Sequence, residues 1–289
     1  MGRSVLLTGA GGRVGQAILR DIGPKHDWRL LDREPLPANK LPEEIDKSDV
    51  YVVDVTNLEA VRNAAAGCDV IIHLAGDPRP DAPWESVLHN NIDGTRAVMQ
   101  AAVDEGVEKV AFASSNHAVG YYETDERKPD LYRTHDRYRL DGTELPRPSN
   151  LYGVSKAAGE SLGRYYHDEH GLSVVCVRIG NLTKGHPPRN YERGQAMWLS
   201  YRDCAHLFDC CISADYGYEI VYAISDNDRK YYSIENTRRV LDYQPRDNSA
   251  EYHLDGTPKN DEVADGGRVS EPDESSGEQP EPKNADADD

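Results

Sequence analysis

The chain has 289 residues, with 51 acidic against 33 basic residues and a formal net charge of −18. This balance excludes a general nucleic-acid binder, because neutralising a phosphate backbone needs a net basic face. No stretch approaches the roughly 18–20 apolar residues of a membrane-spanning helix, and no signal-peptide pattern precedes the apolar run at residues 4–7. We therefore expect a cytoplasmic protein with no nucleic-acid or membrane partner.

The acidic residues have two competing explanations. A tail that is mostly Asp, Glu, Pro, Gly and Ser from about Asp261 onward accounts for part of the excess. The rest is spread along the chain, and arginine clearly outnumbers lysine. At high ionic strength the repulsion between surface carboxylates is screened, so a densely acidic surface is tolerated. The composition therefore favours a halophilic source.

Short apolar runs alternate with helical patterns along the chain, which predicts βαβ units and a parallel sheet. The expected strands cover residues 4–8, 29–32, 50–54, 69–74, 109–114, 173–179 and 219–224, and the expected helices cover 14–22, 58–66, 85–105, 151–169, 202–212 and 234–241. The strands are dense in Val, Ile and Leu without alternation, as in a sheet covered on both faces. We expect an α/β fold, a Rossmann-type doubly wound parallel sheet with a small C-terminal substrate-binding part.

Two segments interrupt this alternation. Residues 120–150 form a long polar loop, and loops of that length inside a compact domain usually have a function. Residues 181–198 are expected to be irregular, because Pro187-Pro188 excludes a helix there. We assign residues 1–252 to one domain, with substrate-binding elements mainly in 77–84, 115–150 and 181–235. Residues 253–289 are expected to form an acidic, disordered tail.

The cysteines are not spaced as metal ligands. All five occur in apolar contexts, at Cys68, Cys176, Cys204, Cys210 and Cys211. Such thiols are most simply packed in the core of a protein from a reducing compartment. The sequence therefore predicts core thiols and no metal site.

A glycine-rich turn, Gly9-Ala-Gly-Gly12-Arg-Val-Gly15, follows the first expected strand and opens the first expected helix. Its glycines let backbone N–H groups approach a pyrophosphate at the helix N-terminus. The second strand ends in Asp32, whose carboxylate would bind the ribose hydroxyls and repel a 2′-phosphate. NAD is thus predicted over NADP, with Arg33 weakening the preference. Asp54 would meet the adenine edge or serve only as a turn residue.

Tyr152 and Lys156 lie four residues apart in an expected helix, so their side chains share one face. An unperturbed tyrosine has a pKa near ~10, too high for a base at neutral pH. A nearby cation favours the phenolate, which would make Tyr152 a usable base. Ser115, at the end of the fifth strand, would hydrogen-bond the substrate hydroxyl and hold it against Tyr152.

Together, these residues resemble the extended branch of the short-chain dehydrogenase/reductase superfamily. The matching positions, within about residues 3–246, are Gly9, Gly12, Gly15, Asp32, His73-Leu-Ala-Gly76, Asn91-Ile-Asp-Gly-Thr95, Ser114-Ser115 and Tyr152/Lys156. The resemblance implies Tyr152 as general base and Lys156 as a contact of the ribose and the tyrosine. It implies that Ser115 orients the substrate and that Asn91 helps hold a water near Lys156. The further cofactor contacts would be Arg13, Val14, Val55, Leu74, Ala75 and Ile179.

Within the superfamily the chain is most similar to the uronate dehydrogenases and to the NAD-dependent glucose-6-phosphate dehydrogenases of halophilic archaea. The similarity is carried by Ser114-Ser-Asn-His117, Leu151-Tyr-Gly153, Arg178-Ile-Gly180 and Tyr243-Gln-Pro-Arg-Asp247. It implies oxidation of the C1 hydroxyl of a cyclic aldose to a lactone, with hydride passed to NAD. Asn116, His117 and Asn181 would contact the sugar. Uronate dehydrogenases have serine at the position of Asn181, where this chain departs from them.

The loop at residues 184–193 is unusually basic for so acidic a chain, with Lys184, His186, Arg189 and Arg193. One arginine binds a carboxylate well, whereas a phosphate has more charge and more oxygens and is bound better by several cations. We therefore expect glucose 6-phosphate as substrate and 6-phosphogluconolactone as product, with Arg189 and Arg193 as contacts. The alternative is a uronate (glucuronate or galacturonate) that gives an aldarolactone, with the cations only balancing surface charge.

Two further classes compete with a sugar dehydrogenase. A sugar-nucleotide epimerase usually has a sizeable C-terminal domain, for which few residues remain between Gly180 and the expected tail. A non-catalytic NAD-sensing protein would have no need of Tyr152, Lys156 and Ser115 together. Because the family tends to associate through its long helices, here 85–105 and 151–169, a homodimer or larger homo-oligomer is expected.

Overall fold

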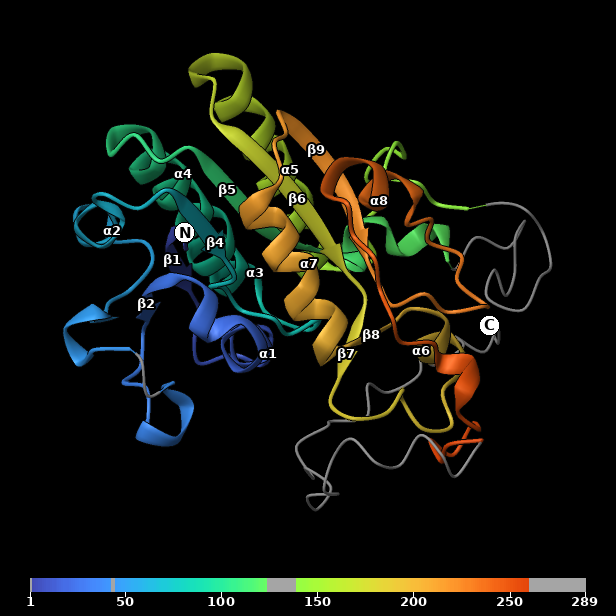
Figure 1. Ribbon diagram of the computed structural model, residues 1–289. Helices are drawn as coiled ribbons and strands as arrows, with labels where there is room; N and C mark the ends of the chain where they lie inside the picture. Colours follow the sequence, from blue (N-terminus) through green and yellow to red (C-terminus); the bar gives the residue numbers. More distant parts are fainter. Residues whose placement is uncertain (1, 43–44, 124–138, 260–289) are drawn as a thin grey trace.

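The computed structural model describes residues 2–42, 45–123 and 139–259 (Figure 1). Within them, seven parallel strands form one sheet in the order β3-β2-β1-β4-β5-β6-β9. The strands are β1 (Ser4–Thr8), β2 (Asp27–Asp32), β3 (Val50–Val52), β4 (Val70–His73), β5 (Lys109–Ser115), β6 (Ser173–Ile179) and β9 (Tyr218–Ala223). The chain runs outward from β1 to β3 and returns to place β4 beside β1. Ligands of such sheets bind outside the carboxyl ends of the strands at this reversal.

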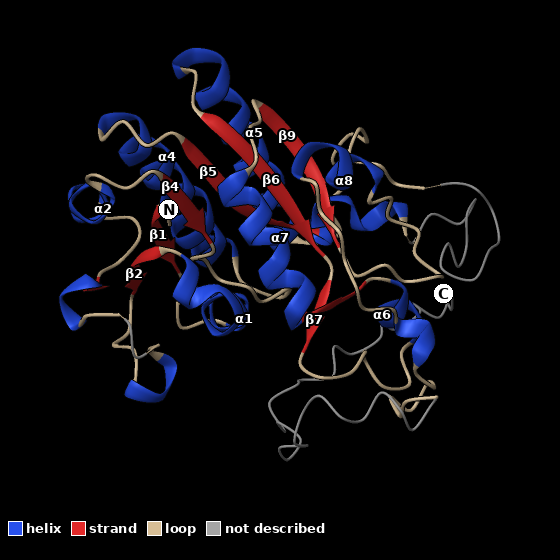
Figure 2. Cartoon of the chain, in the orientation of Figure 1, coloured by secondary structure: helices blue, strands red, loops and turns tan. Residues whose placement is uncertain are grey.

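Helices cover both faces of the sheet, as the density of apolar residues in the strands predicts. One face carries α1 (Arg13–Ile22), α7 (Tyr201–Ser213) and α8 (Glu235–Leu241), and the other carries α2 (Leu58–Ala65), α4 (Gly94–Asp104) and α5 (Leu151–His170). Figure 2 shows α1 and α7 in front of the strands. The helix expected over 85–105 is a continuous helical run made of α3 (Trp84–Ser86), a π-helical stretch (Val87–Asp93) and α4.

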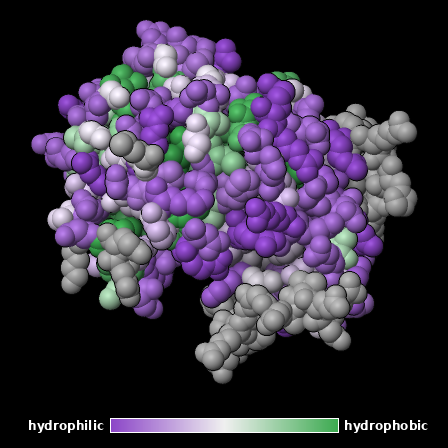
Figure 3. All heavy atoms as spheres, in the orientation of Figure 1, coloured by the Kyte–Doolittle hydropathy of each residue, from purple (hydrophilic) through white to green (hydrophobic). Residues whose placement is uncertain are grey.

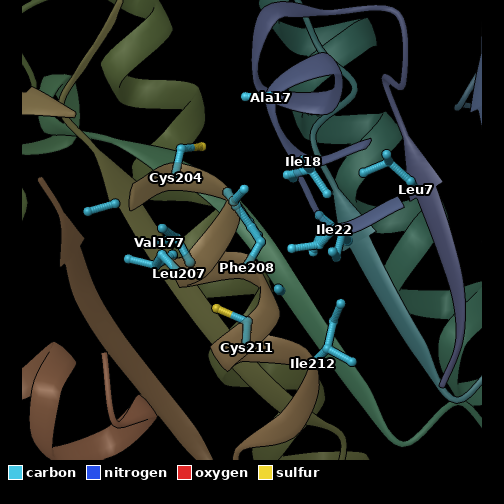
Figure 4. Packing of buried hydrophobic residues seen from close by; sticks show 14 of the residues in the cluster. Leu7, Ala17, Ile18, Ile22, Val177, Cys204, Leu207, Phe208, Cys211 and Ile212 are labelled. Atoms are coloured by element: carbon cyan, nitrogen blue, oxygen red, sulfur yellow. The ribbon is translucent and has the colours of Figure 1, made fainter. Parts of the chain in front are cut away.

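Alternate residues of each strand enter two separate apolar layers. In β1, Leu7 packs under α1 and α7, whereas its neighbour Leu6 packs under α2 and α4. Figure 4 shows the first layer, in which Phe208 and Leu207 of α7 lie among side chains of α1 and the strands. The outer surface in Figure 3 is mostly hydrophilic, in keeping with the charged composition.

Replacing Phe208 with alanine is expected to lower the free energy of unfolding by about 3–5 kcal/mol, since the ring is fully buried and its loss leaves a cavity. Urea unfolding at high KCl measures this change. The matched control is Tyr165→Ala in α5, where the ring is 55% exposed and the expected effect is below about 1 kcal/mol. Equal effects of the two substitutions would contradict the packing described for α7.

The segment 181–198 is more regular than the sequence predicts. It contains β7 (Asn181–Thr183) and the short helix α6 (Glu192–Ala196), and β8 (Trp198–Ser200) pairs in parallel with β7. The two prolines at 187 and 188 do exclude a helix at their own positions. The prediction of an irregular segment is wrong for the flanking residues, because three-residue strands are stabilised by partners that a local pattern does not reveal.

The folded part of the chain continues beyond the predicted boundary at residue 252. Leu254 O accepts a hydrogen bond of 2.6 Å from Asn190 N, and His253 N donates to Thr257 O at 2.8 Å. Gln195 Nε2 donates to Leu254 O at 3.4 Å. Residues 253–259 thus pack against the loop between β7 and β8 and do not belong to a disordered tail. The rest of that tail, 260–289, and residues 124–138 of the predicted polar loop lie outside the described residues.

Among the residues that the structure describes, no helix is long and apolar enough to cross a membrane. The cysteines are free thiols; Cys210 is half-buried and the other four are buried. Burial raises the pKa of Cys68, Cys176, Cys204 and Cys211. These thiols are therefore core residues of low reactivity, as the sequence predicts.

Candidate active site

A cleft of about 600 Å³ opens at the carboxyl ends of the central strands, where the strand order reverses. Every residue that the sequence predicts as a cofactor contact lies on its wall: Gly9, Gly12, Arg13, Val14, Gly15, Asp32, Arg33, Asp54, Val55, Leu74, Ala75, Gly76, Tyr152, Lys156 and Ile179. Of the predicted catalytic and sugar-contacting residues, Ser115, Asn116, His117 and Asn181 also line it. One cavity therefore joins the glycine turn to the Tyr152 region.

The glycine turn is possible only with glycine at its close contacts. Gly9 has a φ of 70°, and a Cβ there would lie 2.8 Å from the amide nitrogen of Ala75. A Cβ on Gly15 would lie 2.6 Å from the carbonyl oxygen of Ala10. The turn therefore packs directly against β4's exit loop and leads into α1 at the edge of the cleft.

Asp32 is held by the turn that it faces. Its Oδ2 accepts a hydrogen bond of 2.8 Å from Gly11 N, and its Oδ1 accepts a weaker one of 3.4 Å from Glu34 N. Lys40, also on the wall, donates through Nζ to Gly11 O at 2.8 Å. The end of β2 thus presents a carboxylate to the cleft with cations close by, and Lys40 is a wall residue that the sequence analysis did not single out.

Tyr152 and Lys156 lie on the buried side of α5. The Lys156 Nζ is 5.5 Å from the centre of the Tyr152 ring and 5.1 Å from that of Phe112 in β5. Asn150 begins the helix, since its Oδ1 accepts from Gly153 N at 2.7 Å. A Cβ on Gly153 would lie 2.3 Å from the carbonyl oxygen of His117, so glycine allows α5 to approach the end of β5 closely.

Burial controls the protonation of this pair. It raises the pKa of Tyr152 to about 12; a hydrogen bond with Ser115 opposes the increase, and the Asp77 carboxylate adds to it. Burial also lowers the pKa of Lys156 to about 8. At neutral pH Tyr152 is therefore a neutral phenol and Lys156 is mostly a cation.

Asn91 lies in the π-helical stretch and is buried, but it is not on the cleft wall. Its Oδ1 accepts from Asp77 N at 2.6 Å, and its Nδ2 donates to Asp77 O at 3.1 Å and to Ser155 Oγ at 2.9 Å. The side-chain amide therefore ties the loop after β4 to α5. The water contact near Lys156 that the sequence predicts for Asn91 stays a prediction.

Asp77 is a wall residue within a predicted substrate element, although no sequence pattern singles it out. Its carboxylate binds the guanidinium of Arg79 with contacts of 3.0 and 2.6 Å and accepts from Ser86 Oγ at 2.6 Å. These bonds hold the pKa of Asp77 well below its usual range. A permanent negative charge therefore borders the cleft near Tyr152.

The sequence predicts that the basic residues of the 184–193 segment contact the substrate, but most of them do not line the cleft. Arg189 is exposed and packs beside His186 and Gly256, away from the cleft wall, and Lys184 is exposed as well. Arg193 is partly buried and forms an ion pair with Glu123. Burial lowers the pKa of His117 to about 4, and the charge of Arg193 adds to the decrease. Of the four predicted cations, Arg193 is thus the one that acts electrostatically on a cleft residue.

Comparison with known proteins identifies the family. The model of the NAD dependent epimerase/dehydratase family matches residues 5–200, and the chain belongs to this family. It is 72% identical over 258 residues to the NAD-dependent glucose-6-phosphate dehydrogenase of Haloferax volcanii, covering 89% of this chain and 98% of the relative. It is 36% identical over 259 residues to the L-arabinose 1-dehydrogenase (NAD(P)(+)) of the same organism, covering 85% and 97%.

Among solved structures, a tyrosine-to-alanine variant of uronate dehydrogenase from Agrobacterium tumefaciens complexed with NAD has a TM-score of 0.75. It is 33% identical, and the match covers 90% of this chain and 92% of that one. These findings confirm the predicted family, the Rossmann-type fold and an NAD-dependent enzyme. The halophilic source predicted from composition agrees with the relatives from Haloferax volcanii.

Proposed function

We propose that this protein oxidises the C1 hydroxyl of glucose 6-phosphate to 6-phosphogluconolactone, with Tyr152 as the base. The observation that carries the substrate is the 72% identity to a glucose-6-phosphate dehydrogenase over 89% of the chain. The chemistry is supported by Ser115, Tyr152 and Lys156, which line the same cleft as the glycine turn.

The cleft fits a dinucleotide. Gly9 and Gly15 let the turn close tightly against the backbone of Ala75 and Ala10. The N–H groups at the start of α1 would then meet a pyrophosphate, and Asp32 would accept hydrogen bonds from the adenosine ribose. Lys156 would contact the second ribose as well as Tyr152. Asp54 and Val55 would border the adenine.

Ser115 and Tyr152 would bind the C1 hydroxyl between them, and Tyr152 would accept its proton. Because burial keeps the pKa of Tyr152 near 12, its phenolate needs positive charge nearby. Lys156, a cation below pH 8, provides one such charge. Bound NAD would supply a second positive charge and would serve as the acceptor of the hydride from C1. Loss of the hydroxyl proton and of that hydride leaves C1 as the lactone carbonyl.

The sugar would extend past Asn116, His117 and Asn181 toward Arg193, which we propose as the contact of the phosphate. Arg189 lies outside the cleft wall, so a role for it in binding needs a movement of its loop. A single arginine near the sugar end is also what a carboxylate requires. This observation favours a uronate as the second candidate substrate.

The substrate is tested by NADH formation at high KCl with glucose 6-phosphate, glucose, L-arabinose and glucuronate. The proposal expects glucose 6-phosphate to be oxidised with a kcat/KM at least about 100-fold above that of glucose, because two charge-assisted hydrogen bonds are lost without the phosphate. Preference for glucuronate would make the protein a uronate dehydrogenase, and preference for an uncharged sugar would remove Arg193 from substrate binding.

Substitution of Asp32 by asparagine is expected to raise the NADP/NAD ratio of kcat/KM by about 10–100-fold. The change removes the negative charge that opposes a 2′-phosphate and leaves Arg33 and Lys40 on the wall. Steady-state kinetics with both cofactors measure the ratio. Asp54→Asn, another wall carboxylate whose Oδ1 accepts from Thr56, serves as the control and should leave the ratio within about threefold. An unchanged ratio in Asp32→Asn would remove Asp32 as the selector.

We further propose a cytoplasmic homodimer. Partly exposed apolar side chains gather on α3, the π-helical stretch and α5, which are the helices that the family tends to use for association. They are Trp84, Leu88, Leu151 and Val154. Light scattering during size-exclusion chromatography at high KCl gives the mass directly, and a monomer would contradict the proposal.

A further inference from the structure

A buried ion pair lies on the helix that carries Tyr152. Glu160 in α5 and Arg178 in β6 have side chains that are 3% and 0% exposed. The guanidinium meets the carboxylate through two parallel contacts, Nε to Oε1 at 2.8 Å and Nη2 to Oε2 at 2.9 Å. Two parallel hydrogen bonds fix the orientation of both groups as well as their distance.

The pair continues the functional face of α5. Tyr152, Lys156 and Glu160 follow one another at intervals of four residues, so their side chains lie along one side of the helix. Lys156 and Glu160 are both buried. The Glu160 carboxylate therefore connects this face of α5 to the sheet through its ion pair with Arg178.

The same carboxylate also binds β5. Ser114 Oγ donates to Glu160 Oε1 at 2.6 Å, and Ser114 is paired in register with Arg178. Ser114 directly precedes Ser115, the proposed partner of Tyr152. One carboxylate thus links the helix that carries the base to the strand that carries its serine.

Arg178 extends the network to two more segments. Its Nη1 donates to Tyr222 OH of β9 at 3.1 Å and lies 3.4 Å from Glu144 Oε2. Tyr222 OH also donates to that Glu144 oxygen at 3.2 Å. Removing charges from water is costly, and apolar residues of similar size often give equal or greater stability than a buried ion pair. Apolar residues could therefore hold α5 on the sheet without this ion pair. The ion pair instead points to a role in the exact position of α5.

We propose that Glu160 and Arg178 are positioning residues that set the distance between the Tyr152 phenol and the Ser115 hydroxyl. Neither touches the reacting atoms; they act through α5 and through Ser114. The proposal rests on Tyr152 being the base of the proposed function. It does not depend on which sugar is oxidised.

The test replaces the pair by apolar residues of similar size in the double variant Glu160→Leu/Arg178→Met. We expect a folded protein that binds NAD as the parent does, with kcat lowered between about tenfold and a hundredfold and KM changed less than about threefold. The matched control is Arg164→Met/Asp168→Asn, which removes an exposed ion pair of 2.7 Å on the same helix and should leave kcat within about twofold. A double variant at Glu160 and Arg178 with unchanged kcat would overturn the proposal.

A second readout needs no substrate. In protein with carbon-13-labelled tyrosine and bound NAD, the signal of Tyr152 is assigned by its absence from Tyr152→Phe, and its pKa is followed by titration. The hydrogen bond with Ser115 lowers the pKa of Tyr152, so loosening that contact should raise it in the double variant. If glucose 6-phosphate is not a substrate, the proposed function fails while this shift still reports on positioning.

Ser114→Ala covers the case in which the double variant does not fold. It removes only the bond to Glu160 and leaves the ion pair intact. We expect kcat to fall at least about threefold and the pKa of Tyr152 to rise, with NAD binding unchanged. Parental values for both quantities in Ser114→Ala would overturn the proposal.

Discussion

Replacement of Tyr152 by phenylalanine is expected to lower kcat by on the order of 10²–10⁴-fold while the Kd for NAD changes less than about threefold. The substitution keeps the ring, which packs edge-on against His117 at 5.6 Å and beside Lys156. Only the hydroxyl that is proposed to accept the proton is lost. NADH formation measures kcat, and isothermal titration calorimetry measures the Kd.

The control for this variant is Tyr165→Phe, which removes a tyrosine hydroxyl from an exposed position of the same helix. It should change neither quantity by more than about twofold. Parental turnover in Tyr152→Phe would reject Tyr152 as the base, whatever the substrate. Loss of NAD binding in that variant would instead assign the hydroxyl a structural part in the cofactor site.

Replacement of Lys156 by methionine is expected to act in opposite directions on activity and stability. Turnover should fall about 100-fold or more, because the substitution removes the cation that we propose favours the Tyr152 phenolate. The free energy of unfolding at pH 7 should rise by about 3 kcal/mol. Burial lowers the pKa of Lys156 from 10.5 to about 8, and that difference is the cost of keeping the buried side chain charged.

The sign of the pH dependence follows from the same shift. Between pH 8 and 10.5 the unfolded chain binds the Lys156 proton more strongly than the folded one, so the lysine's contribution to stability rises with pH across that window. Below pH 8 both states are protonated and the cost is complete. The stability difference between Lys156→Met and the parent should therefore be largest at pH 7 and shrink toward pH 10.5. Urea unfolding at a series of pH values measures it.

A second buried lysine supplies the contrast. Lys109 Nζ donates to Ala214 O at 2.7 Å and contacts Asp215 Oδ1 at 3.0 Å beyond the end of α7. Lys109→Met should therefore destabilise the protein, because the hydrogen bond to Ala214 O is lost. If Lys156→Met destabilised the protein as much as Lys109→Met, Lys156 would have a structural role. The inference that its buried charge costs stability would then be wrong.

The features that depend on local pattern could be predicted from the amino-acid sequence. A run of apolar residues such as Ser173–Ile179 is long enough to define a buried strand, and the structure has β6 at those residues. The turn from Gly9 to Gly15 combines a strand, glycines and a helix start within a few residues. The spacing of Tyr152 and Lys156 places them on one helix face wherever the helix packs. In each case the partners are sequence neighbours, so periodicity and backbone sterics are sufficient.

Contacts between residues far apart in the chain could not be predicted and came from the folded structure. Strands β7 and β8 form by pairing with each other, with Asn181 opposite Trp198. Residues 253–259 pack on the fold through contacts such as the hydrogen bond from Asn190 N to Leu254 O. The basic residues at 184–193 are close in the sequence, yet Arg193 lies in α6 and pairs with Glu123, while Arg189 lies beside His186 and Gly256. Nothing in the sequence distinguishes Glu160 from other helical glutamates, because its partner Arg178 lies in β6. Such contacts join residues far apart in the chain, and a local pattern says nothing about a partner that only the packing of the sheet supplies.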